Sequence, residues 1–458
     1  MCLLRRGGLF AAAVLLAGSL FGSPVFAQSA LCPTSFPGQP GIAFQGSSCT
    51  NNVTGAYSNT ALASQSLGEL SQSSTQDATR ATMASVSDRR TAETQRCADG
   101  FTRVNGVCKP GTSASRFAPE APDSGTLMSM PDSLLAFQPI LKAPPPTVPA
   151  VEPAARWAVW TQAYGDYERL KGSSPGLGEF SVLGLTATSK TWTGGVLGGG
   201  DFTFRNLATS GDGLIVGVLG GYESSHMSLS TSSISSDPTS PNGFSTLKAQ
   251  LSGPTTGVYA SYFNGGFSTD LAFKVEFFDV GISFNDLLGF QSNPDVGFPP
   301  TSVPFSGSGS TSLNNYTTSG NVNYRIPVAA NLWIEPTAGF QYTRSDYASG
   351  ADQLGLASGS DLRLQGGSRF GVEGAWNAVR VTTVFTGLVY DNVAVSGGVL
   401  QNSPNPQILS DEGKLNVEGI AALNFNHGNG VTSFVQADIL GGPGLFGAGG
   451  KTGLRVAW

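Results

Sequence analysis

The chain has little charge and few histidines, and each shortage excludes a class of protein. Charged residues make up 12% of its 458 residues, against about 25% in an average globular protein. Neither of the two histidines, His226 and His427, has partners at the spacing of a zinc motif or a nucleophile elbow. The net charge of −6 argues against a nucleic-acid partner, which usually needs a basic stripe. We therefore predict no enzymatic activity, no metal, no cofactor and no nucleic-acid binding.

Long apolar runs are missing beyond the first 27 residues. There, Arg5 and Arg6 precede an apolar run over 9–21, and Val25-Phe26-Ala27 supplies small residues where a signal peptidase cuts. This pattern predicts a secretory signal peptide over residues 1–27. An uncleaved anchor is disfavoured because a helical span needs about 20 apolar residues. A helical membrane protein is excluded on the same ground.

The five cysteines all lie in the first quarter of the chain. Cys2 belongs to the predicted signal peptide, which leaves an even number after cleavage: Cys32, Cys49, Cys97 and Cys108. An even number in an exported segment with little core predicts two disulfides, for which three pairings are possible. We favour Cys32–Cys49 and Cys97–Cys108, because an Asn-Gly hairpin turn at 105–106 would bring the second pair together. A metal site is disfavoured because CxxC spacing is absent.

Residues 28–155 differ in composition from the remainder of the chain. From Ser58 to Gln95 the sequence is rich in Ala, Ser, Thr and Gln, which predicts a solvated or lightly packed helix. Four apolar residues share one face of this helix: Leu67, Leu70, Ala78 and Ala81. Prolines then accumulate in a semi-rigid linker. We predict a small region with a helix over 28–117 and a Pro-rich linker over 118–155.

From residue 156 onward, apolar residues recur at every second position, as they do in β-strands. In 269–278, for example, Leu271, Phe273 and Phe277 alternate with polar or small residues. The sequence contains twelve such segments: 156–168, 190–204, 213–230, 248–264, 266–285, 315–326, 330–347, 362–376, 378–396, 413–426, 430–441 and 447–458. Alternate gaps are short, and the others are long and rich in Ser and Gly, notably 231–247 and 286–314.

Short turns at one rim and long loops at the other are typical of outer-membrane barrels. The predicted fold is therefore all-β: a 12-stranded antiparallel transmembrane β-barrel, preceded by a small disulfide-containing, partly helical N-terminal region. The charged residues expected to face its lumen are Asp270, Lys274, Glu276, Arg363, Arg369, Glu373 and Arg455. These side chains either satisfy one another across the lumen, or hold a plug or set an ion preference.

Several short motifs bring a family resemblance into view. Trp157-Ala158-Val159-Trp160 opens the first predicted strand, and Gly217-Val218-Leu219-Gly220-Gly221-Tyr222 lies in the third. The stretch 334–343 and the alternating ending Gly453-Leu454-Arg455-Val456-Ala457-Trp458 add to the set. In this order, the motifs make residues 156–458 resemble the translocator barrel of the autotransporter family (type V secretion).

The resemblance implies a monomeric outer-membrane barrel in contact with outer-membrane lipid and lipopolysaccharide. It implies delivery by periplasmic chaperones and insertion by the barrel-assembly machinery, which would read Leu454, Val456 and Trp458 as the assembly signal. It also implies an N-terminal passenger exported to the cell surface. Passengers are commonly long repetitive β-helices, whereas 28–117 is short. The family places a pore helix just before the first strand, where this chain has prolines over 144–153, so the helix of 58–95 is the candidate for the pore.

Two functions remain open from the sequence. The first is a translocator that anchors and displays a short, disulfide-bonded passenger, which acts as an adhesin or interaction module for an unknown host or surface partner. The second is an outer-membrane pore or structural barrel whose residues 28–155 stay in the periplasm or plug the lumen. We favour the first.

Overall fold

The computed structural model describes most of the C-terminal two thirds of the chain and short parts of the N-terminal third. In the N-terminal third it describes residues 44–45, 50–51, 74–87, 89–91, 101–104 and 107–110. It also describes 155–458 apart from 175–181, 210, 236–242, 291–300, 330, 350, 352–355, 357, 377–378, 397–412 and 429. The predicted signal peptide, Cys32, Cys49, Cys97 and nearly all of the Pro-rich linker lie outside these ranges.

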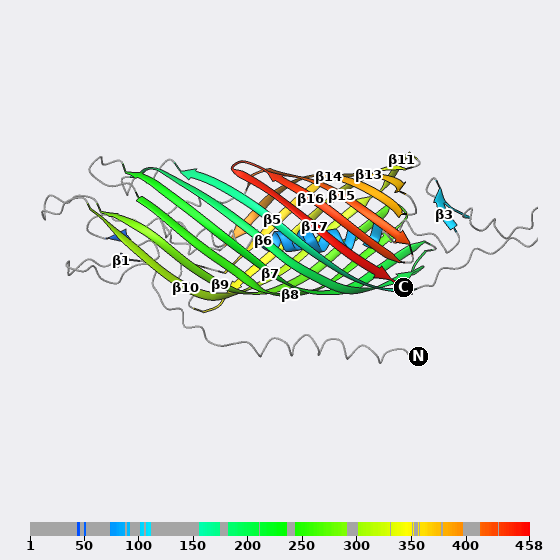
Figure 1. The fold of residues 1–458 in the computed structure, drawn as a ribbon, viewed down its shortest axis with the longest axis horizontal. Helices are drawn as coiled ribbons and strands as arrows, with labels where there is room; N and C mark the ends of the chain where they lie inside the picture. Colours follow the sequence, from blue (N-terminus) through cyan, green and yellow to red (C-terminus); the bar gives the residue numbers. More distant parts are fainter. Residues whose placement is uncertain are drawn as a thin grey trace, which may run out of the picture.

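The residues from 155 onward form a closed antiparallel β-barrel (Figure 1). Its strands are β5 (Ala155–Ser174), β6 (Val182–Arg205), β7 (Asp212–Ser235), β8 (Gly243–Asn264), β9 (Phe267–Phe290), β10 (Thr301–Tyr324), β11 (Ile326–Ala329), β12 (Leu332–Tyr347), β13 (Gly359–Trp376), β14 (Val379–Ser396), β15 (Asn416–Gly428), β16 (Val431–Gly441) and β17 (Leu445–Ala457). The short β11 continues β10 after Arg325, and both pair with β12. The barrel therefore has twelve strands, as predicted.

The barrel closes where β17 pairs with β5. Val456 lies opposite Val159 in this ladder. Beyond it, the backbone N–H of Trp458 donates to the carbonyl oxygen of Trp157 at 3.0 Å, and the N–H of Trp157 donates back at 3.2 Å. Closure matters because an unpaired backbone group in hydrocarbon costs several kcal/mol. These pairs leave neither β5 nor β17 with an open edge inside the bilayer.

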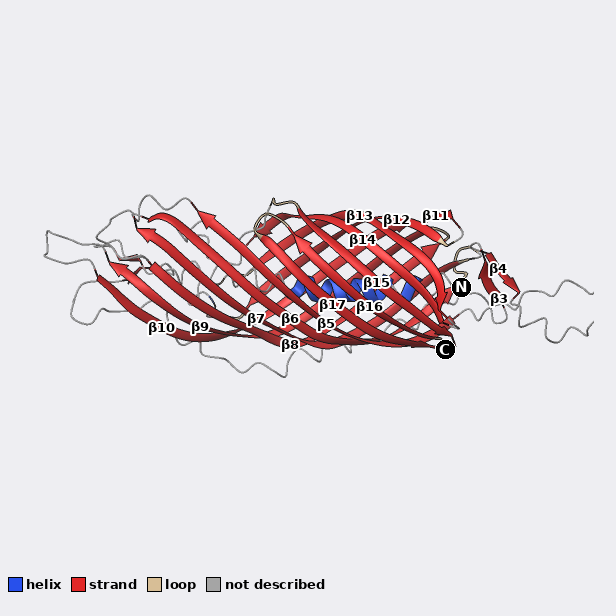
Figure 2. Cartoon of the chain, turned by 45° about the horizontal axis from the view of Figure 1, so that its top comes forward, coloured by secondary structure: helices blue, strands red, loops and turns tan. Residues whose placement is uncertain are grey.

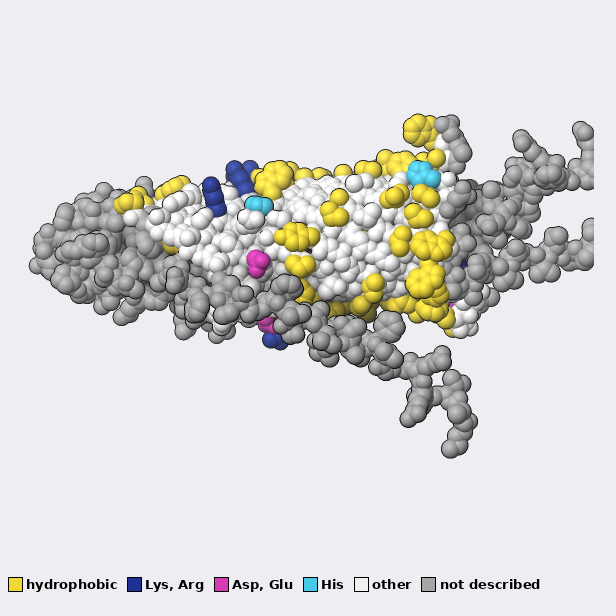
Figure 3. Space-filling view, turned by 60° about the horizontal axis from the view of Figure 1, so that its bottom comes forward, with side chains coloured by type: hydrophobic (Ala, Val, Ile, Leu, Met, Phe, Trp, Pro, Cys, Tyr) yellow, Lys and Arg dark blue, Asp and Glu magenta, His cyan; other side chains and the backbone are white. Residues whose placement is uncertain are grey.

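Aromatic side chains on the outer wall mark the lipid-facing band. Near the short turns the exposed aromatics are Trp157, Phe204, Phe267, Tyr324, Trp376 and Trp458; toward the long loops they are Trp192, Tyr222, Phe277, Tyr316, Tyr342 and Phe446. Trp192 and Phe204 are twelve residues apart on β6, or about 30 Å along the axis for a strand tilted by about 40°. That span matches the hydrocarbon core of a bilayer. Figure 3 shows hydrophobic side chains gathered over this part of one face.

The predicted strands agree with the observed ones except at the long-loop rim. The prediction of a loop over 286–314 is wrong, because β9 continues to Phe290 and β10 begins at Thr301. Likewise, β7 and β8 extend into the predicted loop 231–247, to Ser235 and from Gly243. Figure 2 shows the strands on the β6 to β10 side of the barrel extending farther to the left than β12 to β14 on the other side. These extensions carry Ser and Gly on their outward face, a composition that is typical of loops.

Glycines on the inner wall make room for aromatic side chains. On β6, a Cβ at Gly199 would lie 2.8 Å from the ring of Trp160, and a Cβ at Gly195 would lie 2.6 Å from the hydroxyl of Tyr164. Both aromatics on β5 are buried and lie flat against the neighbouring strand. Because the glycines accept these rings, the centre of the lumen stays free for another element.

In addition to the barrel strands, the described residues form two short hairpins and one helix. β1 (Phe44–Gln45) pairs with β2 (Thr50–Asn51), and β3 (Phe101–Val104) pairs with β4 (Val107–Pro110) around the predicted Asn-Gly turn. In the second hairpin Cys108 lies opposite Arg103, and its pairing with Cys97 stays a prediction. The helix comprises residues 74–87 and 89–91. No described helical stretch is long and apolar enough to cross a bilayer.

We predict that Gly199→Val destabilises the barrel. The new side chain would bring its Cβ to 2.5 Å from the carbonyl oxygen of Val218 as well as into the Trp160 ring. Such overpacking costs about 1–3 kcal/mol. The heat-induced shift from the compact to the unfolded band in detergent electrophoresis should therefore occur at lower temperature. Gly387→Val is the matched control, since a Cβ there has no neighbour within 4 Å. Equal transitions in the two variants would contradict the packing.

Candidate functional site

The helix formed by residues 74–87 and 89–91, here called the lumen helix, lies inside the barrel. Figures 1 and 2 show it enclosed by the strands and running along the barrel. Most of its described side chains are buried, polar ones included, although no lipid or second domain covers them. Each of these polar groups must find a partner in the lumen, because an unsatisfied polar group there loses its contacts with water.

Carboxylates on β7 and β9 bind the first described turn of the lumen helix. The hydroxyl of Ser74 donates to Glu223, which also accepts from the hydroxyl of Tyr164 at 2.7 Å. The hydroxyl of Thr75 donates to Glu276 at 2.9 Å. Lys274 lies 2.5 Å from the same carboxylate of Glu276 and balances its charge. This end of the helix is therefore held by hydroxyl-to-carboxylate bonds to two strands of the wall that lie on either side of β8.

Glu418 on β15 links the middle of the lumen helix to the opposite wall. Its carboxylate lies 3.5 Å from Arg80 of the helix and 3.2 Å from Arg363 of β13. Arg363 also donates to the side-chain oxygen of Gln76 at 3.2 Å, and its guanidinium lies 3.5 Å from the ring centre of Tyr390. One barrel arginine thus contacts a helix amide, a wall carboxylate and an aromatic ring.

One face of the lumen helix is apolar and packs on the wall of β5 to β9. Ala78 and Ala81 are fully buried there, together with Val86. They share a cluster with the inward aromatics and aliphatics of the wall: Trp160, Tyr164, Leu197, Ile215, Leu219, Tyr259, Phe263 and Ala272. Small side chains at 78 and 81 let the helix backbone approach the rings closely. The predicted helical face therefore exists at these two positions.

Asp201 near the short-turn end of β6 receives three polar groups. The guanidinium of Arg89 lies 2.8 Å from one carboxylate oxygen of Asp201 and donates to Thr203 at 2.8 Å. The hydroxyl of Tyr259 donates to the other oxygen at 2.8 Å, and Arg455 of β17 lies 3.7 Å from it. Arg455 also donates to the backbone carbonyl oxygen of Ser85 in the helix at 3.3 Å.

Glu335 on β12 is surrounded by three guanidinium groups. Arg90 of the lumen helix lies 3.3 Å from it, and Arg325 and Arg369 of the wall lie 3.1 and 2.9 Å from it. Arg369 also donates to the hydroxyl of Ser87 at 2.6 Å. Arg90 additionally reaches Asp270 at 3.4 Å. Breaking a buried pair of this kind typically costs about 3–5 kcal/mol, because one charge is left uncompensated.

Acidic side chains outnumber basic ones on the described inner wall. The acidic ones are Asp166, Asp201, Glu223, Asp270, Glu276, Glu335, Asp361, Glu418 and Asp438; the basic ones are Lys274, Arg325, Arg363, Arg369, Lys451 and Arg455. In its described residues the lumen helix adds Arg80, Arg89 and Arg90 against Asp77. The helix arginines therefore offset part of the acidic excess of the wall.

The structure brings most of the seven charged residues singled out in the sequence to the helix. Asp270, Glu276, Arg363, Arg369 and Arg455 contact it directly, and Lys274 does so through Glu276. Glu373 lies farther along β13, near the short turn, where its backbone N–H donates to the carbonyl oxygen of Asn331 at 2.8 Å.

Sequence reasoning did not single out the three helix arginines or their partners Asp201 and Glu418. Alternation on β12 did place Glu335 on the polar face, but without indicating that it gathers three cations. Arg89 and Asp201 are more than one hundred residues apart in sequence, and no local pattern encodes that contact. A count of lumen charges from all twelve strands would have shown the acidic excess.

The two histidines and the described acidic groups show no arrangement typical of catalysis. His226 is exposed on the outside of β7. His427 lies near the β15–β16 turn, where its Nε2 is 2.8 Å from the hydroxyl of Ser433. Within the described ranges, no three His, Cys, Asp or Glu side chains are grouped so as to hold a metal ion.

The fold and the enclosed helix define a translocator-type outer-membrane barrel, and comparison with known families agrees. The family model described as the autotransporter beta-domain matches residues 159–438, more than half of the 458-residue chain. The chain therefore belongs to the autotransporter β-domain family. Barrels of this family are outer-membrane proteins. No curated protein sequence matches the chain.

Solved structures of autotransporter barrels are similar to this chain at low identity. The β-domain of the Bordetella autotransporter BrkA is 16% identical, with a TM-score of 0.40, and the match covers 66% of this chain and 99% of that one. The transport unit of AIDA-I from Escherichia coli is 14% identical, with a TM-score of 0.44 and coverage of 65% and 90%. The translocator domain of NalP from Neisseria meningitidis is 11% identical, with a TM-score of 0.33 and coverage of 66% and 88%.

We predict that Arg89→Gln loosens the lumen helix. The substitution leaves Asp201 buried without its closest cation, at a cost of about 3–5 kcal/mol. Single-channel recordings in planar bilayers should then show frequent openings where the wild-type barrel stays mostly closed. Adding Asp201→Asn removes the uncompensated charge and should restore much of the closure. If Arg89→Gln opens as rarely as the wild type, the ion pair does not hold the helix.

Proposed function

We propose that this protein is an outer-membrane translocator that anchors and displays the residues preceding the lumen helix, about 28–73, at the cell surface. The observation that carries the proposal is the direction of the helix. Ser74 and Thr75 contact Glu223 and Glu276, well away from the short turns. At its other end, Thr91 accepts from Arg325, which lies between β10 and β11 at a short turn. Short turns face the periplasm in outer-membrane barrels.

This direction divides the region that the sequence grouped together as 28–117. The described start of the helix, Ser74, is directed toward the long-loop rim, which faces outward in such barrels. The described end of the helix, Thr91, and the first residue of β5, Ala155, both lie near the short turns. We therefore propose that 28–73 is the displayed part and that 92–154, with the β3–β4 hairpin, is periplasmic. Figure 1 draws β3 beyond the end of the barrel at which the C-terminus lies.

The displayed part is proposed to act as an interaction module. It holds the pair Cys32 and Cys49, which would form a disulfide in an oxidising compartment, and no residues spaced for catalysis. In its more specific form, the proposal is that residues 28–73 mediate adhesion to a host or surface partner, which a cell-binding assay tests. The remaining partners are those of any such barrel: outer-membrane lipid, lipopolysaccharide, periplasmic chaperones and the barrel-assembly machinery.

The alternative function, an open pore, has less support. A pore needs a continuous aqueous path, whereas the lumen helix fills the centre of this barrel with paired charges and a packed apolar face. Conduction would require the helix to leave. The acidic excess of the wall would then favour cations, which is a property of the emptied barrel.

We predict that an epitope inserted after Gly55 is bound by antibody on intact cells, whereas the same epitope after Gly125 is bound only after the outer membrane is permeabilised. The two sites flank the lumen helix, and each follows a glycine in a polar stretch. Binding at neither site on intact cells would favour a plug or periplasmic segment. Binding at both would contradict the direction of the helix.

A further inference from the structure

Strands β6 to β10 extend beyond the lipid-facing band. In this extension the apolar side chains face inward and the polar side chains face outward, which is the reverse of the arrangement in the band. On β9, Phe278, Val280, Ile282 and Phe284 are buried on the inner face, while the intervening residues, beginning with Asp279, point outward. Below Phe277 the order is reversed, with apolar residues outside and Lys274 or Glu276 inside. This part of the sheet, here called the outer sheet, therefore suits water on its outer side and an apolar partner on its inner side.

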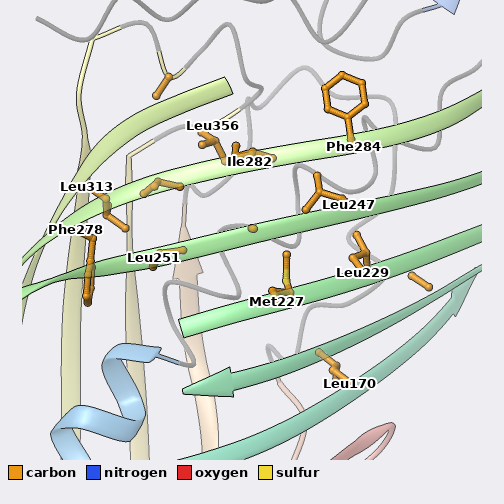
Figure 4. Close-up of a cluster of buried hydrophobic side chains, with 14 of the residues drawn as sticks. Leu170, Met227, Leu229, Leu247, Leu251, Phe278, Ile282, Phe284, Leu313 and Leu356 are labelled. Carbon is orange, nitrogen blue, oxygen red and sulfur yellow. The ribbon is translucent and has the colours of Figure 1, made fainter. Parts of the chain in front are cut away.

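The inner face of the outer sheet is lined by a continuous apolar cluster. Most of its members come from β6 to β10: Ala187, Met227, Leu229, Leu247, Ala249, Leu251, Phe278, Val280, Ile282, Phe284 and Leu313. Figure 4 shows these side chains reaching inward from adjacent strands, with Leu356 of the β12–β13 connection beside Ile282. These side chains are between 0% and 5% exposed, so the chain itself covers this apolar face at the exit of the polar lumen.

The chain that leaves the lumen passes this surface directly. Thr75 is bonded to Glu276, and Phe278 is the next inward residue along β9. Ser74 is bonded to Glu223, and Met227 is two inward positions farther along β7. For strands tilted by about 40°, Phe278 and Met227 lie about 5 and 10 Å beyond these bonds along the barrel axis. A chain continued from Ser74 toward the long-loop rim would therefore pass along the cluster.

The residues immediately before Ser74 carry apolar side chains at the required spacing. Leu70 precedes the buried Ala81 by eleven residues, and Leu67 precedes the buried Ala78 by the same interval. Eleven residues make about three helical turns, so a helix continued through this segment would place the leucines on the same face as Ala78 and Ala81. At about 1.5 Å per residue, Leu70 and Leu67 would lie about 6 and 10 Å beyond Ser74. These levels match those of Phe278 and Met227.

We propose that Leu67 and Leu70 dock on the apolar inner face of the outer sheet and anchor the displayed segment there. The freely accessible chain then ends near residue 66. The occupant is this chain itself, because its length and exit point bring these residues to the surface. The inference rests on the proposed outward course of residues 28–73.

Photo-crosslinking on intact cells tests the docking. The full-length chain carries p-benzoylphenylalanine in place of Phe278, and the matched control carries it in place of the lipid-facing Phe277. After irradiation, mass spectrometry should find crosslinks from position 278 to residues 62–73 and none to that segment from position 277. Crosslinks from 278 only to lipid, to a second molecule or to other strands would overturn the proposal.

A pair of double variants adds a second readout in the same crosslinking background. Leu67→Asp with Leu70→Asp should lower the crosslink yield at least about tenfold, because two charges would enter an apolar surface. Gln65→Asp with Gln72→Asp, which places the charges on the opposite side of the same helix, should keep it. Heat-modifiable mobility on gels verifies that each barrel is folded. The epitope after Gly55 distinguishes failure of the docking from failure of the proposed function. An epitope that is exposed on intact cells without crosslinks from position 278 contradicts the docking alone, whereas a protected epitope contradicts the proposed display.

Discussion

The charges buried on the inner wall of the barrel must be paired within the lumen, and much of the structure depends on that requirement. Lipid covers the outer face and admits no counter-charge, so each inward carboxylate has only the lumen in which to find a cation. The described wall carries more acids than bases, and the helix arginines offset part of this excess. Glu335 makes the point locally, since its three guanidinium partners come from the lumen helix and from the wall around it.

Several features of the wall serve this pairing. Inward glycines on β6 accept Trp160 and Tyr164, so that the rings lie against the wall and the helix fits beside them. The hydroxyl of Tyr164 then bonds to Glu223, which holds Ser74. Ala78 and Ala81 bring the helix backbone close to the same wall. A helix seated by such specific contacts has one direction, and that direction determines which part of the chain emerges at each membrane face.

The sequence predicts the barrel well because lipid imposes a strict period of two. Leu271, Phe273 and Phe277 on β9 are exposed, and Asp270, Lys274 and Glu276 are buried, as alternation indicates. The short turns also fall where predicted. The outer sheet was mistaken for loops, because 301–312 is rich in Ser and Gly and its water-facing side resembles an irregular segment. The contacts of Arg80, Arg89 and Arg90 could not be predicted, since the rotation and depth of a helix in a lumen depend on packing across the whole chain.

Engineered cysteine crosslinks test the seat and direction of the lumen helix most directly. In a chain whose native cysteines are replaced by serine, Thr75→Cys with Asn315→Cys marks the outer contact, whose side chains are 2.6 Å apart, and Thr91→Cys with Arg325→Cys marks the inner one. A short bismaleimide is used for every pair, because the arginine side chain spans more than a direct disulfide can. A protease site placed within 118–154 separates helix from barrel unless a crosslink joins them. The account predicts that the reagent keeps the fragments linked in both native pairs and in neither exchanged pair, Thr75→Cys with Arg325→Cys or Thr91→Cys with Asn315→Cys. Linkage in the exchanged pairs, or in none, would contradict it.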